Sequence, residues 1–334
     1  MAISHRSNPR ASLRIEQLFG IPVLMSGLGG LIISTKEENL INQHHKLTIS
    51  GLQRLHPKTP STVIYFLAGS LPGTALLHLK QLSLFGMICR LRNSTLYKHA
   101  VNIFHSRTIS QHSWFHQIRE YCLMYKLPHP SVLITSPLPK AQFKKLIKSH
   151  VMDYWEQTLR TEAGPLTSLT FFKPSFMSLN RIHPIWSTAG SSPSKVIMAT
   201  IQARMVSEYL CRHWSKNVHG VCLLSVSCKS TIEDLPHILL DCPALQPTRD
   251  KMVSFTMDFC RKNPHLCQLI LQYLSPYHPL FCQFLLDCSV VPETILLTQI
   301  HGSETLNHLF HVTRTWCYTL HRERLKLLGR WNAV

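Results

Sequence analysis

Three cysteines and one histidine lie close together in the sequence between residues 220 and 251. Cys222, Cys228, His237 and Cys242 follow the pattern C-x5-C-x8-H-x4-C. Thiolate sulfur and neutral imidazole nitrogen are donors that Zn²⁺ prefers, and four protein donors complete its tetrahedral shell and leave no position for a substrate. The pattern therefore predicts a structural zinc site that has no catalytic residue of its own.

The spacing of these four residues leaves a second interpretation open. Five residues separate the first two cysteines, whereas paired zinc cysteines usually lie two to four residues apart. Reduced cysteine is also among the most buried residue types, so the thiols and the imidazole could be ordinary core groups. Glu233 and Asp234 precede a short apolar run from His237. This arrangement predicts that the imidazole lies on a helical turn and that Cys242 lies just beyond its end.

The chain is strongly basic, with a formal net charge of +18 over 334 residues. So large an excess favours polyanionic partners, either nucleic acid or an anionic membrane face. Basic and aromatic residues near the cysteines, and a lysine-rich segment before them, could neutralise phosphates and stack on bases. The candidate nucleic-acid-binding residues are Lys144, Lys145, Lys148, Arg212, Trp214, Lys216, Lys229, Arg249 and Lys251. Alternatively, the lysines form only a solvated helix face and Trp214 is a core residue.

The cysteine count and the N-terminal segment bear on the compartment. Eleven cysteines, an odd number, make a disulfide framework improbable, and the first 19 residues are basic without an apolar core. The apolar run 20–33 is too short and too rich in glycine to span a membrane. We therefore expect a nuclear or cytoplasmic protein that is not secreted and has no membrane partner.

Hydrophobic periodicity predicts a mainly α fold: an irregular helical bundle with a small CCHC zinc module and a C-terminal helical extension. A capping box formed by Thr35 and Glu38 should begin the first long helix, and residues 1–19 should form a loose arm. Residues 164–193 are expected to connect elements over the surface. The helices are expected at 36–55, 72–90, 111–125, 141–161, 194–215, 244–261 and 303–328.

Motifs of the common catalytic sites are absent from the sequence. It contains no G-x-x-x-x-G-K-[ST], no H-E-x-x-H and no G-x-S-x-G pattern. The glycines at 27, 29 and 30 lack the full dinucleotide-binding pattern, and only six aspartates are available to hold catalytic Mg²⁺. We therefore assign no catalytic residue.

Three segments together resemble one family. They are YFLAGSLPGTALLHLKQLSLFGMICRL (65–91), IQARMVSEYLCRHWSKNVHGVC (201–222) and EDLPHILLDCPALQPTR (233–249). In this order they resemble the C-terminal region of reverse transcriptases encoded by non-LTR, LINE-type retrotransposons. The resemblance implies thumb-like and linker helices followed by a cysteine/histidine module, whose four ligands fall on Cys222, Cys228, His237 and Cys242. The aromatic-x-Asp-Asp signature of the family polymerases is absent here.

The resemblance implies a division of the chain and a function. The expected units are a basic arm and first helix (1–60), a thumb-like region (61–163), a linker with its helix (164–215), the zinc module (216–250) and a C-terminal helical region (251–334). The function implied is binding of an RNA or DNA backbone without polymerase or endonuclease activity, with an intact retrotransposon reverse transcriptase as a possible partner. The alternative is an inert remnant or a protein-interaction scaffold, whose apolar helix 72–90 would be left as an exposed patch.

Overall fold

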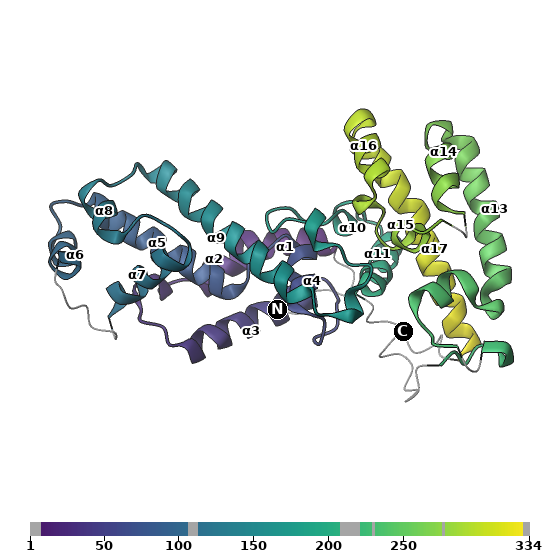
Figure 1. Cartoon of the computed structure of the whole chain (residues 1–334), viewed down its shortest axis with the longest axis horizontal. Coiled ribbons are helices and arrows are strands. Elements are labelled where there is room, and N and C mark those ends of the chain that lie inside the picture. The colour runs from purple at the N-terminus through teal and green to yellow at the C-terminus, as the bar shows by residue number, and fades with distance from the viewer. Residues whose placement is uncertain (1–7, 106–112, 208–220, 229–230, 276–277, 330–334) are drawn as a thin grey trace.

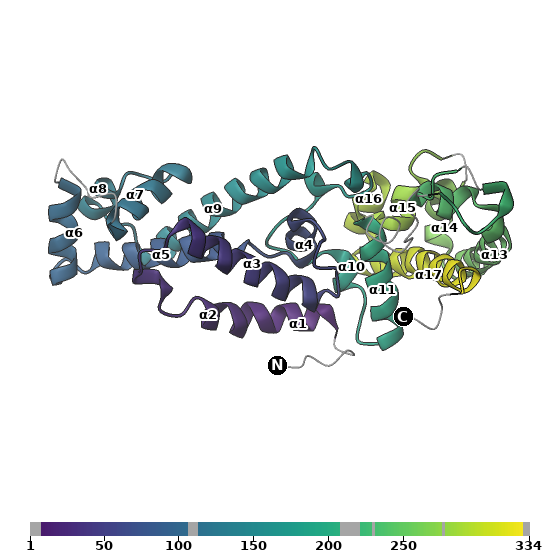
Figure 2. The ribbon, with the colours of Figure 1, turned by 90° about the horizontal axis from the view of Figure 1, so that it is seen from below.

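The computed structural model describes residues 8–105, 113–207, 221–228, 231–275 and 278–329 (Figure 1). Helix is the only extended regular structure in these ranges, which otherwise hold a single antiparallel bridge between Val221 and Ile232. The expected mainly α fold is confirmed. The molecule is elongated, with helices α1 to α9 forming an N-terminal body and helices α11 to α17 forming a C-terminal body at the other end (Figures 1 and 2).

The N-terminal body is built around α5 (Gly73–Arg90), which packs against helices on several sides. Gly86 allows a close approach there, because a Cβ at this position would lie 2.2 Å from the ring of Phe143 on α9. The other helices of this body are α1 (Pro9–Ile15), α2 (Ile21–Leu24), α3 (Thr35–Leu52), α4 (Ser61–Ala68), α6 (Thr95–His105), α7 (Trp114–Met124), α8 (Pro130–Thr135) and α9 (Lys140–Ala163).

Three details of this body differ from the sequence expectations. The capping box of α3 is formed by Ser34 and Glu37, one residue earlier than expected. Residues 9–20 are helical and pack on the body, so the loose arm was wrong for the described part of that segment. Helix α5 is largely buried against its neighbours and is not the exposed patch that the scaffold hypothesis expected.

The C-terminal body surrounds α17 (Ser303–Leu327), a long helix whose buried face includes Leu309, Phe310 and Trp316. Around it pack α11 (Pro193–Val206), α13 (Gln246–Lys262), α15 (Phe281–Leu286) and α16 (Pro292–His301), and α14 (Pro264–Tyr273) packs against α13. The expected helices 244–261 and 303–328 are therefore confirmed to within a few residues. The last eight residues of the helix expected at 194–215 lie outside the described residues, from 208 onward.

The segment 164–193 joins the two bodies and is buried in part, which corrects the expected surface connection for residues 182–189. Its short helix α10 (Pro184–Ser187) carries the fully buried Ile185 and Trp186. The indole Nε1 of Trp186 donates to Gln53 Oε1 at 2.9 Å, and Arg314 on α17 donates to the Ile185 carbonyl at 2.9 Å. Aromatic burial with satisfied polar groups makes α10 a part of the core.

Candidate metal centre

The four predicted ligands come together from three short local structures. Cys222 follows the bridge residue Val221, and Cys228 ends a 3-10 turn (Val226–Cys228). His237 begins a single π-helical turn (His237–Asp241), and Cys242 caps the end of that turn. Cys242 N–H donates to the His237 carbonyl at 2.7 Å, which holds the last two ligands at a fixed separation. The expectation of an imidazole on a helical turn with Cys242 beyond it is confirmed.

The ligand atoms of these residues converge on one point. The three sulfurs and a nitrogen of His237 all lie within 4.8 Å of one another, and all four residues are buried. Cys222 Sγ and Cys242 Sγ are 3.8 Å apart. The group has the composition and geometry to hold a metal ion, and no other group in the described residues has them.

The thiols and the imidazole of this cluster differ in their protein partners. The Cys222 and Cys242 sulfurs accept hydrogen bonds from the backbone N–H groups of Leu224 and Ala244. Neither ring nitrogen of the buried His237 has a hydrogen-bond partner among the described residues. Buried polar atoms are rarely left in this state, because each unsatisfied one costs about 1–3 kcal/mol. Burial, reinforced by the neighbouring thiols, raises the pKa of Cys222 to about 12, and burial also raises the pKa of Cys242. A cation bound between the sulfurs would lower these pKa values and favour the thiolate form at neutral pH.

Two buried cations support this cluster from outside. Arg249, on the first turn of α13, donates through Nη2 to the Cys242 carbonyl at 2.7 Å and to Gln246 Oε1 at 2.8 Å. Glu233, ahead of the ligand turn, forms a two-point ion pair with Arg324 of α17, at 2.9 and 2.6 Å. Both side chains of this pair are almost fully buried. The pair fixes the cluster to the longest helix of the C-terminal body.

The candidate phosphate-binding residues have different positions in the structure. Lys144, Lys145 and Lys148 are exposed on α9, and Lys251 is exposed on α13. Arg249 is 7% exposed, which corrects its expected role as a surface phosphate contact, because burial commits its guanidinium to the Cys242 carbonyl. The remaining predictions, Arg212, Trp214, Lys216 and Lys229, lie outside the described residues.

The ion pair between Glu233 and Arg324 was not identified from the sequence. The two residues are 91 positions apart, and the only sequence signals were an acid just before the ligand turn and a basic end of the last helix. Neither signal indicates pairing, since the partner is chosen by the packing of α17.

Comparisons of the chain with protein-family models, with curated protein sequences and with solved structures found no match. Within the described ranges, no single helix is long and apolar enough to cross a membrane, and only the bent pair α4 and α5 together has the required length and composition.

Proposed function

We propose that this protein binds the backbone of a nucleic acid through the lysine face of α9, and that its C-terminal body is stabilised by zinc. Nucleic-acid binding by α9 is supported by the separation of charged and apolar side chains on opposite faces of this helix. Lys140, Lys144 and Lys148 are exposed at every fourth position, about 6 Å apart along the axis. Phe143 and Ile147, on the opposite face, are buried.

The lysine face is not neutralised within its own segment. Residues 140–152 contain four lysines and no acidic residue, and none of the ion pairs found in the described residues involves these lysines. A row of free ammonium groups at this spacing suits a phosphate backbone, which needs charge and little shape complementarity. We propose a single-stranded nucleic acid as the ligand, because its unpaired bases can add stacking to the phosphate contacts.

The salt dependence of oligonucleotide binding tests this face. Fluorescence anisotropy of a labelled single-stranded RNA should show an affinity that falls steeply as salt rises, because each contacted phosphate releases counterions. The triple variant Lys144→Gln, Lys145→Gln, Lys148→Gln should reduce the slope of log affinity against log salt by about 2, at roughly 0.7 per single-strand phosphate. A control triple variant, Lys36→Gln, Lys58→Gln, Lys195→Gln, removes the same charge from other exposed sites. Equal slopes for both variants would reject the proposal.

Zinc is the metal that the donor set fits best. Two sulfurs bound tetrahedrally at about 2.3 Å from Zn²⁺ lie about 3.8 Å apart. This agrees with the 3.8 Å between Cys222 Sγ and Cys242 Sγ. Three thiolates and Zn²⁺ leave one net negative charge, which the buried Arg249 beside the Cys242 carbonyl would offset. Elemental analysis of purified protein should give one equivalent of zinc per chain, and a chelator should remove it with loss of structure.

The resemblance to LINE-type reverse transcriptases suggests a role for this nucleic-acid binding. The cluster of Cys222, Cys228, His237 and Cys242 agrees with the ligand set that the resemblance implies. We infer that the chain corresponds to the C-terminal part of such an enzyme, binds its template or target, and incorporates no nucleotide itself. Addition of the purified chain to an intact reverse transcriptase of this type should change primer extension on a shared template. An unchanged extension rate would contradict the partnership.

A protein-interaction scaffold is a second candidate, and one observation favours it. Ile15, Leu18, Phe19 and Val23 are between 59% and 75% exposed on the helical segment from α1 to α2. Contiguous apolar side chains of this kind are typical of an association surface. Light scattering over a range of concentrations separates the two functions. Self-association that Leu18→Ser with Phe19→Ser abolishes, without any RNA binding, would favour the scaffold.

A further inference from the structure

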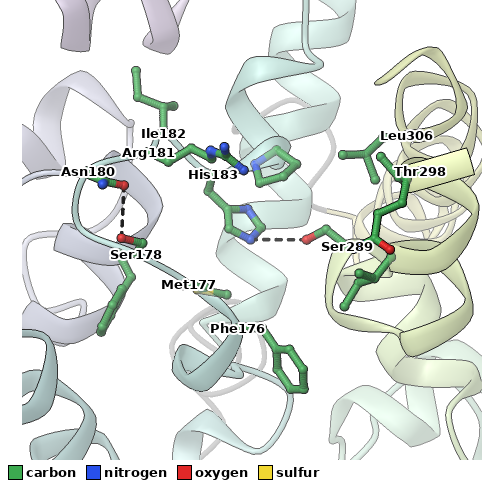
Figure 3. Close-up of a pocket in the computed structure, with 14 residues that line it drawn as sticks. Phe176, Met177, Ser178, Asn180, Arg181, Ile182, His183, Ser289, Thr298 and Leu306 are labelled. Atoms are coloured by element: carbon green, nitrogen blue, oxygen red, sulfur yellow. Dashed lines mark hydrogen bonds between the residues drawn. The ribbon is translucent and has the colours of Figure 1, made fainter. Parts of the chain in front are cut away.

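A cavity of about 400 Å³ lies between the linker and the C-terminal body (Figure 3). One wall is formed by residues 176–184, and the other by Ser289, α16 and the beginning of α17. Its volume is within the range of small-ligand sites. Figure 3 shows His183 reaching from the linker toward Ser289, with Thr298 and Leu306 on the opposite wall.

Behind the wall formed by His183 and Ser289 lies the buried Asp287, which contacts both. His183 Nε2 lies 3.2 Å from Asp287 Oδ2 and 3.5 Å from Ser289 Oγ, which itself donates to Asp287 Oδ1 at 2.6 Å. A hydrolase triad would need a free lone pair on the histidine nitrogen that faces the serine. Here the Ile185 N–H donates to His183 Nδ1, so the proton of the neutral imidazole is on Nε2. These three side chains therefore fix the wall and generate no nucleophile.

The linker wall is also held rigidly from behind. Gly69, at the end of α4, has a positive φ of 59°. A Cβ at this position would lie 2.3 Å from the backbone carbon of Arg181. Glycine therefore allows close contact between the two backbones, and this contact fixes the position of the Arg181 Cα. The wall is formed before any ligand arrives, which reduces the entropy lost on binding.

The groups that line the cavity suit an anionic ligand with a flat apolar part. No carboxylate is among the lining residues. The exposed Arg181 guanidinium makes no ion pair or hydrogen bond within the described part of the chain. Phe176 presents a 59% exposed ring at the linker wall, and the Gln299 amide lies on the opposite wall. The Asn180 amide keeps its N–H donors, because its Oδ1 accepts from Ser178 Oγ (Figure 3). Guanidinium, aromatic face and amides are the groups that recognise phosphate, base face and base edge.

We propose that this cavity takes one unstacked nucleotide of a bound single strand, with Arg181 on its phosphate and Phe176 on its base. The proposal rests on the nucleic-acid binding proposed above and names the contact that would hold a base. The lysine face of α9 would supply affinity through the backbone, and the cavity would hold a single nucleotide by stacking and by one charge-assisted contact.

Photochemical crosslinking with the full chain tests the proposal. A short single-stranded RNA that carries one 4-thiouridine is irradiated on the protein, and mass spectrometry locates the crosslinked peptide. We expect the crosslink within residues 174–184. Phe176→Ala should weaken RNA binding by about 5- to 150-fold, the range found when one stacking contact is lost. Leu123→Ala is the matched control, because Leu123 is 72% exposed and lies outside the cavity.

Charge variants separate a phosphate contact from general attraction. Arg181→Gln should lower the salt slope of RNA binding by about 0.7, the contribution of one single-strand phosphate. Lys262→Gln removes one exposed charge away from the cavity and should leave both the slope and the crosslink unchanged. RNA that binds with its crosslinks elsewhere, and with equal slopes for these two variants, overturns the cavity proposal but leaves the lysine face standing. RNA that does not bind at all overturns the proposed function itself.

Discussion

The two bodies each bury a cluster of polar side chains, and the clusters differ in how their hydrogen bonds are satisfied. In the N-terminal body, His78 Nδ1 lies 2.6 Å from the Tyr125 hydroxyl and His78 Nε2 lies 3.2 Å from Glu38 Oε1. The Tyr121 hydroxyl donates to Glu38 at 3.1 Å, and Trp155 Nε1 donates to Tyr125 at 3.1 Å. Each of these donors has an acceptor, so the network is complete without any added group.

The cluster in the C-terminal body is the opposite case. Three thiols and the imidazole of His237 face one another within 4.8 Å, and both nitrogens of the ring lack partners among the described residues. A buried imidazole without hydrogen bonds is costly, and a cation bound between it and the three sulfurs would remove this cost. The comparison teaches that burial alone does not indicate a ligand site. A ligand site is indicated when metal-ligating side chains converge on one point and some of their polar atoms have no protein partner. We therefore predict that loss of metal destabilises the C-terminal body and not the N-terminal body.

Replacement of one converging donor should have the largest effect. Cys242→Ser is expected to abolish stoichiometric zinc and to unfold the segments 221–228 and 231–245, with a loss of several kcal/mol, because metal binding free energy is also folding free energy. The control Cys89→Ser changes a buried thiol of the N-terminal body that lies outside the cluster. It should cost about 1–3 kcal/mol and leave the zinc content unchanged. Elemental analysis and thermal unfolding measure both quantities.

The opposite result would remove the distinction between the clusters. If Cys242→Ser and Cys89→Ser gave the same loss of stability, and if a chelator moved neither unfolding transition, the thiols would be ordinary core groups. The unpaired state of the His237 nitrogens would then need another explanation, such as a buried water.

The sequence predicted the parts of the molecule that depend on local pattern. The four donors lie within 21 residues, and the lysines of α9 follow helical periodicity, so both could be identified from spacing. The burial of Arg249 could not be predicted, because it depends on a carbonyl seven residues away that becomes an acceptor only after the ligand turn forms. The buried linker was missed for a similar reason. Its Trp186 finds a partner 133 positions away, and proline-rich composition resembles that of a surface loop.

The buried ion pair between Glu233 and Arg324 gives the next effect in size. Glu233→Gln should destabilise the C-terminal body by about 3–5 kcal/mol, because it leaves a buried guanidinium without its countercharge. The pair Glu233→Met with Arg324→Met should recover much of this loss, since it removes both charges and fills similar volume. Denaturant unfolding followed by tryptophan fluorescence measures these differences. We expect zinc to stay bound in both variants, because neither residue is a ligand.

The zinc content of Glu233→Gln shows whether the ion pair is needed to bind the metal or only anchors the cluster. If Glu233→Gln lost zinc as completely as Cys242→Ser, the ion pair would be required to assemble the cluster and not only to anchor it. An unchanged free energy of unfolding in Glu233→Gln would instead show that water reaches the Arg324 guanidinium.

His45 tests whether unpaired ring nitrogens alone indicate a metal ligand. It is buried in the N-terminal body, and neither of its ring nitrogens has a hydrogen-bond partner in the described structure. It belongs to no group of side chains that could hold a metal ion. Burial lowers its pKa to about 4. Between pH 6.5 and 4 the unfolded chain binds a proton that the folded protein excludes, so stability falls as pH falls through this window. At pH 5 the loss attributable to His45 is about 2 kcal/mol, at about 1.4 kcal/mol per pH unit. His45→Phe should remove this part of the pH dependence, whereas His301→Gln, at an exposed histidine, should not. Identical pH profiles for His45→Phe and the unmodified protein would mean that the imidazole is protonated in the fold, and would weaken the inference from the unpaired nitrogens of His237.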